Sequence, residues 1–278
     1  MQALAGGGPQ LKELVRYPLK SGVGERLEDA EVERRGLAGD RRWMVVDREG
    51  AFLTAREHAH LLLVRAVPGA LGALTLVAEG RSPCVVQAPS AQQRPVSVSV
   101  WADNCAAFCL GDVAARWMSE HLGLECRVVY MPDTVERVPG GDVARSDDLV
   151  SFADGYPLLL AQRESLNQLN SQLAPKVPMT CFRPNLVVAG FEPFAELTWS
   201  RLRIGALEFE VAGPCVRCQL TTRDPKTGER RRDGEPLATL AKNHRSEDGV
   251  VFGINLIPRT LGRLRVGDPV EILVTHEE

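Results

Sequence analysis

The stretch Gly213-Pro214-Cys215-Val216-Arg217-Cys218-Gln219-Leu220-Thr221-Thr222-Arg223-Asp224-Pro225 places a cysteine pair inside a strand-like run. A redox-active dithiol normally stands at the start of a helix instead. Cysteine thiolates bind soft or borderline metals, and a neighbouring guanidinium such as that of Arg217 or Arg223 favours the thiolate form. The segment therefore predicts a candidate metal site carried by a strand.

The first half of the chain has the same strand character. Short alternating apolar runs, separated by turns rich in Gly, Pro and Asp, predict an antiparallel β-barrel or sandwich. One helix is expected here, with Asp112 as its N-cap and Gly123 as its stop. The expected strands cover residues 11–15, 31–35, 43–47, 61–67, 74–78, 84–87 and 96–101.

The second half mixes strands with short helices. Residues 131–148 are rich in Pro, Gly, Asp and Arg and are expected to form a linker or long loop. Beyond it we expect helices at 158–173 and 237–244, strands at 186–190, 250–256, 262–266 and 270–274, and a hairpin at 202–222 that turns near Gly205. The fold class is therefore α+β and predominantly β. At 278 residues, the chain is expected to form two domains, at residues 8–130 and 145–276.

Composition narrows the class of protein. The formal net charge is −3 and no basic block reaches five residues, so nucleic acid is not an expected partner. The densest basic run, residues 230–232, is interpreted as a solvated loop, with a docking patch for an acidic partner as the weaker alternative. Seven cysteines without a dense framework predict reduced thiols in the cytoplasm. No apolar run is long enough to predict a membrane span.

Taken alone, Cys215 and Cys218 leave other interpretations open. A structural zinc site needs four ligands, and no second Cys-x-x-Cys or His-x-His cluster accompanies this pair. Two small buried hydrophobes on a strand would also explain the pair, because free cysteine is often part of a core. The spacing by itself does not choose between a metal ligand and a packed side chain.

Three cationic clusters lie at expected turns or strand ends. Lys20, Arg41 and Arg56, together with the hydroxyl of Ser21, are the groups that bind phosphate, because cations match its charge and a hydroxyl adds a hydrogen bond. Each cation taken singly is more often a surface side chain with a packed apolar stem. The clusters are Tyr17-Pro18-Leu19-Lys20-Ser21, Gly39-Asp40-Arg41-Arg42-Trp43 and Thr54-Ala55-Arg56.

A fourth cluster, Phe182-Arg183-Pro184-Asn185, precedes an apolar strand. The proline and the strand would fix the direction of Arg183 and Asn185, so that a cation and an amide can hold an anion or a heterocycle. An ion pair between Arg183 and an acid of the other domain explains the cluster equally well. The turn that starts at Asp154 could add a polar contact to a ring.

Together these segments resemble the MOSC family, in the form that has an N-terminal MOSC-type β-barrel domain followed by the MOSC domain, as in the amidoxime-reducing molybdenum enzymes. The resemblance runs from about residue 11 to residue 273 and implies two β-barrel domains with a few flanking helices. Besides the four clusters above, its landmarks are the Cys215-x-Arg217-Cys218 run, Thr221-Thr222-x-Asp224-Pro225-x-Thr227-Gly228 and Val266-Gly267-Asp268-Pro269-Val270.

The resemblance also implies a cofactor site between the domains. Cys218 would be the thiolate ligand of the molybdenum in a molybdopterin cofactor, and Cys215 would be its neighbour. The phosphate and pterin would be held by Lys20, Ser21, Arg41 and Arg56 from the first domain, and by Asp154, Arg183 and Asn185 from the second.

The activity implied by the resemblance is two-electron oxygen abstraction from N-hydroxylated compounds such as amidoximes, hydroxylamines and N-hydroxylated bases. Electrons would come from a separate donor protein, which could be a ferredoxin, a flavodoxin or a cytochrome b5-like protein with its reductase. The chain lacks a ferredoxin ligand run and a membrane anchor, so no membrane partner is expected. The alternative function is a carrier of sulfur or of the molybdenum cofactor, with Cys218 holding a persulfide or acting as a transient ligand.

Overall fold

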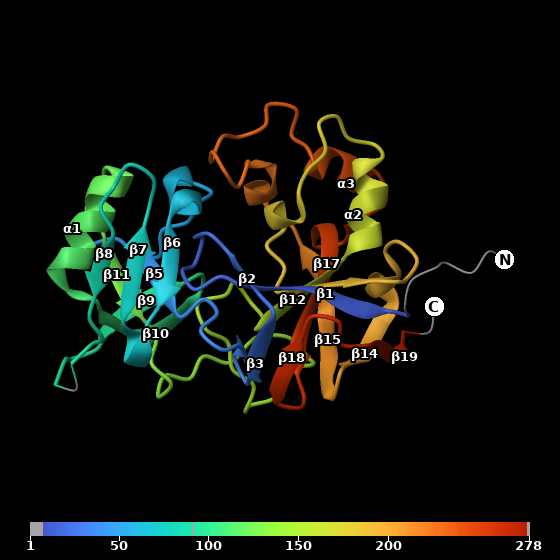
Figure 1. The fold of residues 1–278 in the computed structure, drawn as a ribbon, viewed down its shortest axis with the longest axis horizontal. Coiled ribbons are helices and arrows are strands. Elements are labelled where there is room, and N and C mark those ends of the chain that lie inside the picture. Colours follow the sequence, from blue (N-terminus) through green and yellow to red (C-terminus); the bar gives the residue numbers. More distant parts are fainter. Residues whose placement is uncertain (1–7, 91, 277–278) are drawn as a thin grey trace.

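Strands dominate the structure, a computed structural model that describes residues 8–90 and 92–276. The strands and a few helices form two lobes that lie side by side (Figure 1). The predicted class, α+β and predominantly β, is confirmed. None of the helices in the described part of the chain is long and apolar enough to cross a bilayer.

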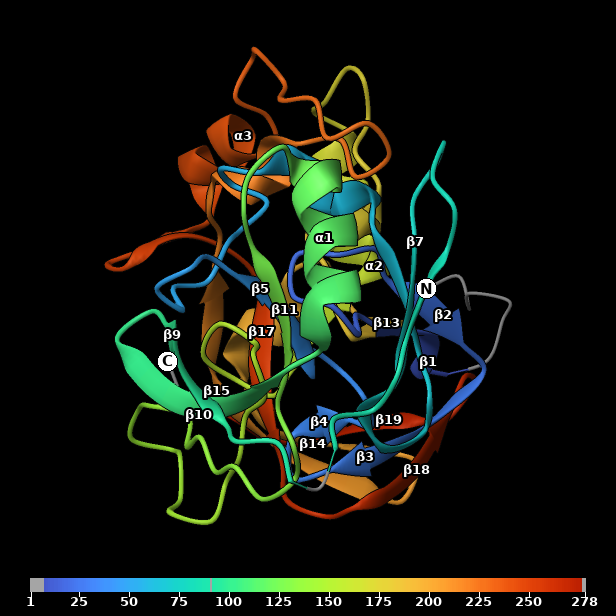
Figure 2. The same ribbon diagram turned by 90° about the vertical axis from the view of Figure 1, so that its left-hand side faces the viewer.

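The first lobe is built from the stretch between residues 43 and 130. Two antiparallel sheets, ordered β5-β11-β10-β9 and β6-β7-β8, form its strands. Helix α1 packs against β8 and β11. Figure 2 views this lobe from its outer side, with α1 beside β11. The elements are β5 (Trp43–Val46), η1 (Ala59–Leu63), β6 (Arg65–Pro68), η2 (Ala70–Gly72), β7 (Leu74–Val77), β8 (Cys84–Val86), β9 (Val96–Val100), β10 (Asp103–Cys109), α1 (Gly111–Leu122) and β11 (Arg127–Tyr130).

Helix α1 forms where the apolar spacing predicts it. Ala114, Trp117 and Met118 lie at helical spacing and are buried in the core of the first lobe. Gly123 ends the helix with a left-handed backbone, φ 72°, as expected. Asp112 lies in the first turn and makes no capping hydrogen bond, so its prediction as the N-cap was wrong.

The second lobe contains both ends of the described chain. Within the described residues, one nine-stranded sheet has the order β19-β14-β15-β17-β12-β13-β1-β2, with β16 paired to β17, and a smaller sheet has the order β18-β3-β4. Strands β12 and β13 are parallel. The first strand of the chain therefore pairs with its C-terminal half, through Leu14 and Leu186 for example.

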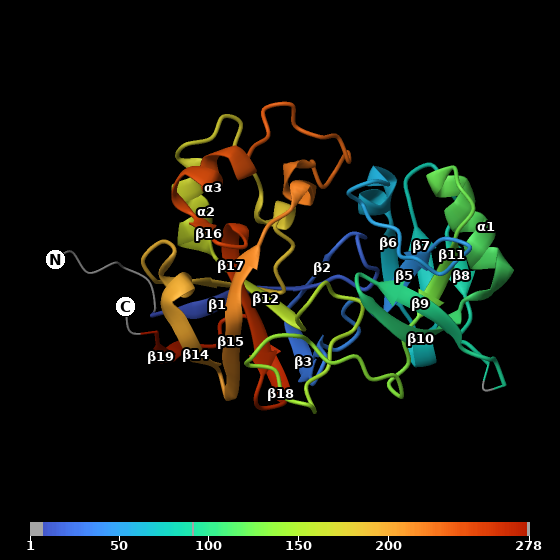
Figure 3. The same cartoon turned by 180° about the vertical axis from the view of Figure 1, so that it is seen from behind.

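The bounds of this lobe's elements complete the fold. The N-terminal strands are β1 (Gln10–Arg16), β2 (Glu25–Leu27), β3 (Asp29–Glu33) and β4 (Gly36–Leu37). The later elements are β12 (Leu158–Gln162), α2 (Arg163–Asn170), η3 (Met179–Cys181), β13 (Leu186–Ala189), η4 (Ala195–Thr198), β14 (Trp199–Ile204), β15 (Leu207–Val216), η5 (Gln219–Thr222), α3 (Leu237–Asn243), β16 (Arg245–Ser246), β17 (Gly249–Pro258), β18 (Gly262–Arg265) and β19 (Val270–Thr275). Figure 3 shows β15 and β17 from behind.

Three predicted elements were wrong. Residues 158–173 are not one helix, because residues 158–162 form the buried strand β12 between β13 and β17, and a short apolar run has no periodicity that separates strand from helix. Residues 61–67 are divided between the 3₁₀ turn η1 and strand β6. The hairpin turns at Gly205 as expected, but its second strand ends at Val216, so Cys218 lies beyond the strand.

Candidate functional site

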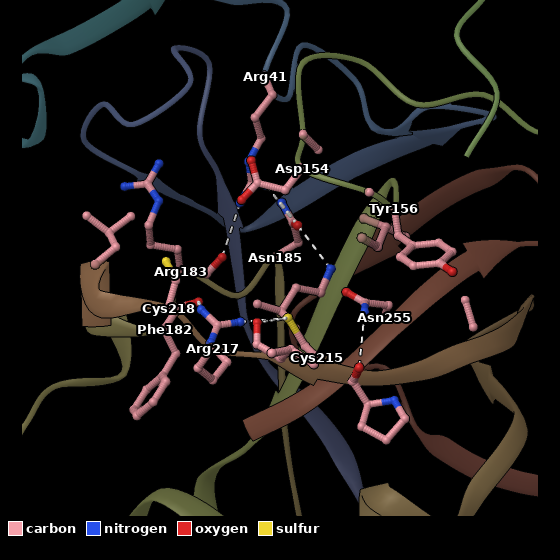
Figure 4. A pocket seen from close by; sticks show the side chains of 18 of the residues that line it. Arg41, Asp154, Tyr156, Phe182, Arg183, Asn185, Cys215, Arg217, Cys218 and Asn255 are labelled. Atoms are coloured by element: carbon pink, nitrogen blue, oxygen red, sulfur yellow. Dashed lines mark hydrogen bonds between the residues drawn. The ribbon is translucent and has the colours of Figure 1, made fainter. Parts of the chain in front are cut away.

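A cleft of about 600 Å³ receives side chains from both lobes. Its walls are the turns after β1 and β4, the loop after β5, the segment before β12, the segment before β13, and the end of β15 (Figure 4). All eight predicted site residues line this cleft, namely Lys20, Ser21, Arg41, Arg56, Asp154, Arg183, Asn185 and Cys218. The fold thus brings together residues that are up to 198 positions apart in the sequence (218 minus 20).

Cys218 is exposed at the wall of the cleft. Strand β15 ends two residues before it, and η5 begins directly after it. The Cys218 carbonyl accepts hydrogen bonds from the amide and the hydroxyl of Thr221, at 3.1 and 3.0 Å, which hold the backbone at this corner. The alternative in which both cysteines are packed core residues is therefore wrong for Cys218.

The guanidinium groups expected beside the thiolate bind elsewhere. Arg217 donates from Nη1 to Sγ of Cys215 at 2.8 Å and from Nη2 to the Phe182 carbonyl at 2.6 Å. Arg223 donates to the carbonyls of Gly228 and Arg56, each at 2.9 Å. Among the described residues, no guanidinium donates to the Cys218 sulfur, so the thiol faces the open cleft without a side-chain partner.

Lys20 and Asp154 form an ion pair inside the cleft. The Lys20 ammonium is buried and also donates to the Phe152 carbonyl at 2.7 Å. Burial lowers the pKa of Lys20 below its ordinary value, although Asp154 opposes that change. Burial alone would raise the pKa of Asp154, but the Lys20 ammonium and a hydrogen bond from Trp101 hold it well below its usual range.

Residues 131–157, which we call the strap, carry Asp154 to this position. The strap contains no helix or strand, which confirms the loop predicted for residues 131–148. It is held by the buried Arg137, which donates to the carbonyls of Ser151, Ala153 and Asp154 at 2.8, 2.7 and 3.0 Å. These bonds fix the backbone that presents the Asp154 carboxylate to Lys20.

The Asn185 side chain is a buried brace, which means that its hydrogen bonds link several segments of the cleft wall. Its Nδ2 donates to the Val15 carbonyl and to Asp40 Oδ1, at 3.1 and 3.0 Å, and its Oδ1 accepts from Arg41 Nη1 and the Leu159 amide, at 2.9 and 3.2 Å. The side chain is 1% exposed. Both of its donors are occupied by protein acceptors, so Asn185 positions the site and has no free donor to offer a ligand.

The ring of Tyr17 supports two arginines of the cleft. The guanidinium carbons of Arg41 and Arg183 lie 4.4 and 4.2 Å from its centroid, at cation–π distance. Arg183 also donates to the Gly22 carbonyl at 2.7 Å. Burial lowers the pKa of Arg183 to about 10, so the side chain still carries its charge at neutral pH.

Arg56 and Ser21 line the wall on the side of the first lobe. Arg56 lies over the Trp101 ring, 4.2 Å from its centroid, and its Nε donates to Thr54 Oγ1 at 3.3 Å. The Ser21 hydroxyl accepts a hydrogen bond from the Ala55 amide at 3.1 Å. That contact leaves the Ser21 proton free to donate, and the terminal nitrogens of Arg56 have no acceptor within the described residues.

Backbone strain is concentrated at this site. Ser21, Arg41 and Arg183 have φ values of 68°, 46° and 56°, a left-handed conformation that costs a non-glycine residue about 1–3 kcal/mol. Trp101, which contacts Asp154 and Arg56, shares it with φ 57°. Such conformations persist only where surrounding contacts impose them, and they cluster at functional sites.

The charge of the cleft is opposite to that of the whole chain. Its lining includes five cations, Lys20, Arg41, Arg56, Arg183 and Arg217, and two carboxylates, Asp154 and Asp248. The lining is therefore net positive by three, in a protein whose formal charge is −3. In residues 8–90 and 92–276, no group of three or more His, Cys, Asp or Glu side chains is placed to hold a metal ion.

Sequence reasoning missed several residues of this site. Tyr17 and Asp40 stand inside the quoted clusters, so their proximity to Lys20 and Arg41 was a usable signal. Trp101 and Arg137 gave no such signal, because their contacts to Asp154 span 53 and 17 residues. The same holds for Asn255, which reaches the cleft through the pairing of β17 with β15, and for Asp248, which directly precedes β17.

Comparison with known proteins defines the class. The family described as "MOSC N-terminal beta barrel domain" matches residues 8–125, and the family described as "MOSC domain" matches residues 147–271. The chain belongs to the family of proteins that combine these two domains, as its sequence motifs predicted.

Its relatives include proteins of mammalian mitochondria. Mitochondrial amidoxime-reducing component 1 of Mus musculus is 34% identical, over 92% of this chain and 80% of that protein. Mitochondrial amidoxime reducing component 2 of Rattus norvegicus is 35% identical, over 93% and 81% respectively. Among solved structures, the YUAD protein from Bacillus subtilis aligns with 94% of this chain at 11% identity and a TM-score of 0.44, a likeness too weak for any conclusion.

Proposed function

We propose that this protein is a molybdenum-cofactor-dependent reductase of N-hydroxylated compounds. The observation that carries the proposal is the exposed thiol of Cys218 at the wall of a net-positive cleft. The names of the relatives, amidoxime-reducing components, support a reductase acting on amidoximes. For benzamidoxime the balanced reaction consumes two electrons and two protons and gives benzamidine and water.

The residues of the cleft fit a cofactor of this kind. A single thiolate supplies one soft ligand, so the other ligands of a metal at Cys218 would belong to the cofactor itself. The free N–H groups of Arg56 and Arg183, the Lys20 ammonium and the Ser21 hydroxyl match an anionic phosphate. When bound, the cofactor would supply the two-electron redox change.

The chain's own residues would bind and orient this group. Cys218 would be the metal ligand and Lys20, Ser21, Arg56 and Arg183 would contact the phosphate and pterin. Arg41 has its Nη1 bonded to Asn185 and its Nη2 bonded to the Arg183 carbonyl at 3.2 Å, so we assign it and Asn185 to positioning rather than to direct contact. Asp154 would hold the Lys20 ammonium in place.

The test compares Cys218→Ser with Cys215→Ser. Wild-type protein from a molybdate-supplied host should contain near-stoichiometric molybdenum and molybdopterin, and it should reduce benzamidoxime with dithionite-reduced methyl viologen. Cys218→Ser should lose both metal and activity, because the ligand sulfur is gone. Cys215→Ser is the matched control and should keep its metal. Full activity of Cys218→Ser would refute the proposal.

The exposure of Cys218 also suits a carrier of sulfur or of the cofactor, which is the second candidate function. An open thiol can accept a persulfide and pass it to another protein. Mass spectrometry of the purified protein distinguishes the two, since a persulfide on Cys218 without molybdenum would favour the carrier. In either case we propose a cytoplasmic protein, and the reductase would need a separate electron donor.

A further inference from the structure

The chain that follows Cys218 forms a short ordered hairpin, residues 223–232, which we call the basic hairpin. Arg223 and Arg230 pair across it, and the Asp224 amide donates to the Glu229 carbonyl at 2.8 Å. The Asp224 carboxylate accepts from the Lys226 amide at 2.7 Å, which closes the Asp-Pro-Lys-Thr-Gly turn. The dense basic run of the sequence therefore lies on a defined surface.

The basic hairpin belongs to the second lobe and contacts the first lobe beside the cleft. Arg223 donates to the carbonyl of Arg56, a cleft residue of the first lobe, at 2.9 Å. Gly228 lies so close to the start of η1 that an added Cβ would be 3.2 Å from the Ala59 carbonyl oxygen. In Figures 1 and 3 this orange segment stands at the top of the second lobe, on the side that faces the first. A protein bound to the hairpin would sit next to the cleft opening.

Most cationic side chains of the basic hairpin form no ion pair with a described carboxylate of the fold. Lys226, Arg230 and Arg232 are exposed, and none of them forms an ion pair with a described residue. Arg231, by contrast, pairs with Asp233 at 2.6 Å and is partly buried. Two exposed carboxylates, Asp224 and Glu229, accompany these cations. With five basic and two acidic residues the hairpin is still locally positive, on a chain of formal charge −3.

We propose that the basic hairpin docks an acidic electron-donor protein beside Cys218. The inference rests on the proposed function, because a reductase must receive two electrons for each substrate molecule it reduces. Unpaired cations held together on an ordered turn attract an acidic partner and speed its association, while the net negative charge of the remaining surface disfavours other orientations. Two one-electron transfers from the docked donor would supply one turnover.

The test reverses the three free charges with Lys226→Glu, Arg230→Glu and Arg232→Glu in one protein. A control protein carries Arg94→Glu, Arg116→Glu and Arg265→Glu, which are exposed, without ion pairs in the described structure, and outside both the hairpin and the cleft. The charge change is the same in both. The probes are a plant-type [2Fe–2S] ferredoxin, an acidic carrier kept reduced by its NADPH reductase, and the small donor methyl viologen reduced by dithionite.

We expect the hairpin variant to lose about tenfold or more in ferredoxin-supported reduction of benzamidoxime at low salt, with little loss in the control. Viologen-supported reduction should be unchanged in both. Calorimetry should show that ferredoxin binds the hairpin variant more weakly than the control variant. Added salt should weaken ferredoxin binding only in proteins with an intact hairpin.

Each contrary outcome has a separate meaning. If wild type does not reduce benzamidoxime with viologen, the proposed function fails. If viologen works but ferredoxin neither binds nor drives the reaction, or if both variants behave alike with ferredoxin, the docking assignment fails while the function stands. Binding of a DNA duplex with the affinity seen for ferredoxin would show a general polyanion surface and would also overturn it.

Discussion

Asn185→Asp would place a second carboxylate against Asp40 in the interior. The Asn185 Nδ2 atom is 3.0 Å from Asp40 Oδ1, and both side chains are at most 2% exposed. Two unit charges at that separation repel by about 5 kcal/mol at an effective dielectric constant of about 20. Arg41, which bonds both side chains, and protonation of one carboxyl offset part of this. We expect a net loss of about 3 kcal/mol in unfolding free energy near pH 8.

The pH dependence of the stability loss distinguishes repulsion between the two carboxylates from the loss of hydrogen bonds. Burial already raises the pKa of Asp40, and a neighbouring carboxylate would raise it further. Carboxyl groups with a raised folded-state pKa stabilise the fold most below their ordinary pKa, and that contribution is lost as pH rises. Urea denaturation should therefore show a much smaller loss for Asn185→Asp near pH 5 than near pH 8.

Asn185→Ala is the uncharged control. It leaves the Leu159 amide and the Val15 carbonyl without their side-chain partner, at about 1–2 kcal/mol each. It also removes the hydrogen bond that lowers the pKa of Asp40, so its loss should grow with pH, but by less than that of Asn185→Asp. The reasoning would be refuted by an Asn185→Asp protein as stable as wild type near pH 8, or by a loss equal to that of Asn185→Ala at every pH.

Two further predictions concern buried polar groups. Burial raises the pKa of Glu196, so the contribution of this carboxyl group to stability is greatest below its ordinary pKa and is lost as pH rises. Glu196→Gln should remove this part of the pH dependence of the unfolding free energy, measured by urea denaturation across the acidic range. An unchanged dependence of the unfolding free energy on pH would contradict the prediction. The Tyr17 hydroxyl is buried without a hydrogen-bond partner among the described residues, and burial raises its pKa to about 12. Tyr17→Phe should keep or raise the melting temperature, whereas Tyr17→Ala should cost about 3–5 kcal/mol, and a large loss in Tyr17→Phe would reveal a hidden partner of the hydroxyl.

Local patterns of residues were enough to predict much of the fold. Gly123 ended α1 because a left-handed stop is a property of the residue itself. The turn at Gly205 likewise followed from local chemistry. Residues 158–162 could not be predicted correctly, because four apolar residues in a row suit a buried strand and a helix alike, and only their pairing with β13 and β17 decides.

The candidate site shows the same division. The sequence by itself determined which groups are available: a thiol at 218, cations at the ends of strands, and an Arg-Pro-Asn run before β13. Only the tertiary structure decided that Lys20 meets Asp154 across 134 residues, that Arg217 contacts Cys215 and leaves Cys218 open, and that Asn185 is a brace. The functional group of each site residue is a property of that side chain alone. The distances between these groups, their burial and the hydrogen-bond donors that they leave free depend on contacts between segments far apart in the chain, and these contacts form only when both lobes have packed.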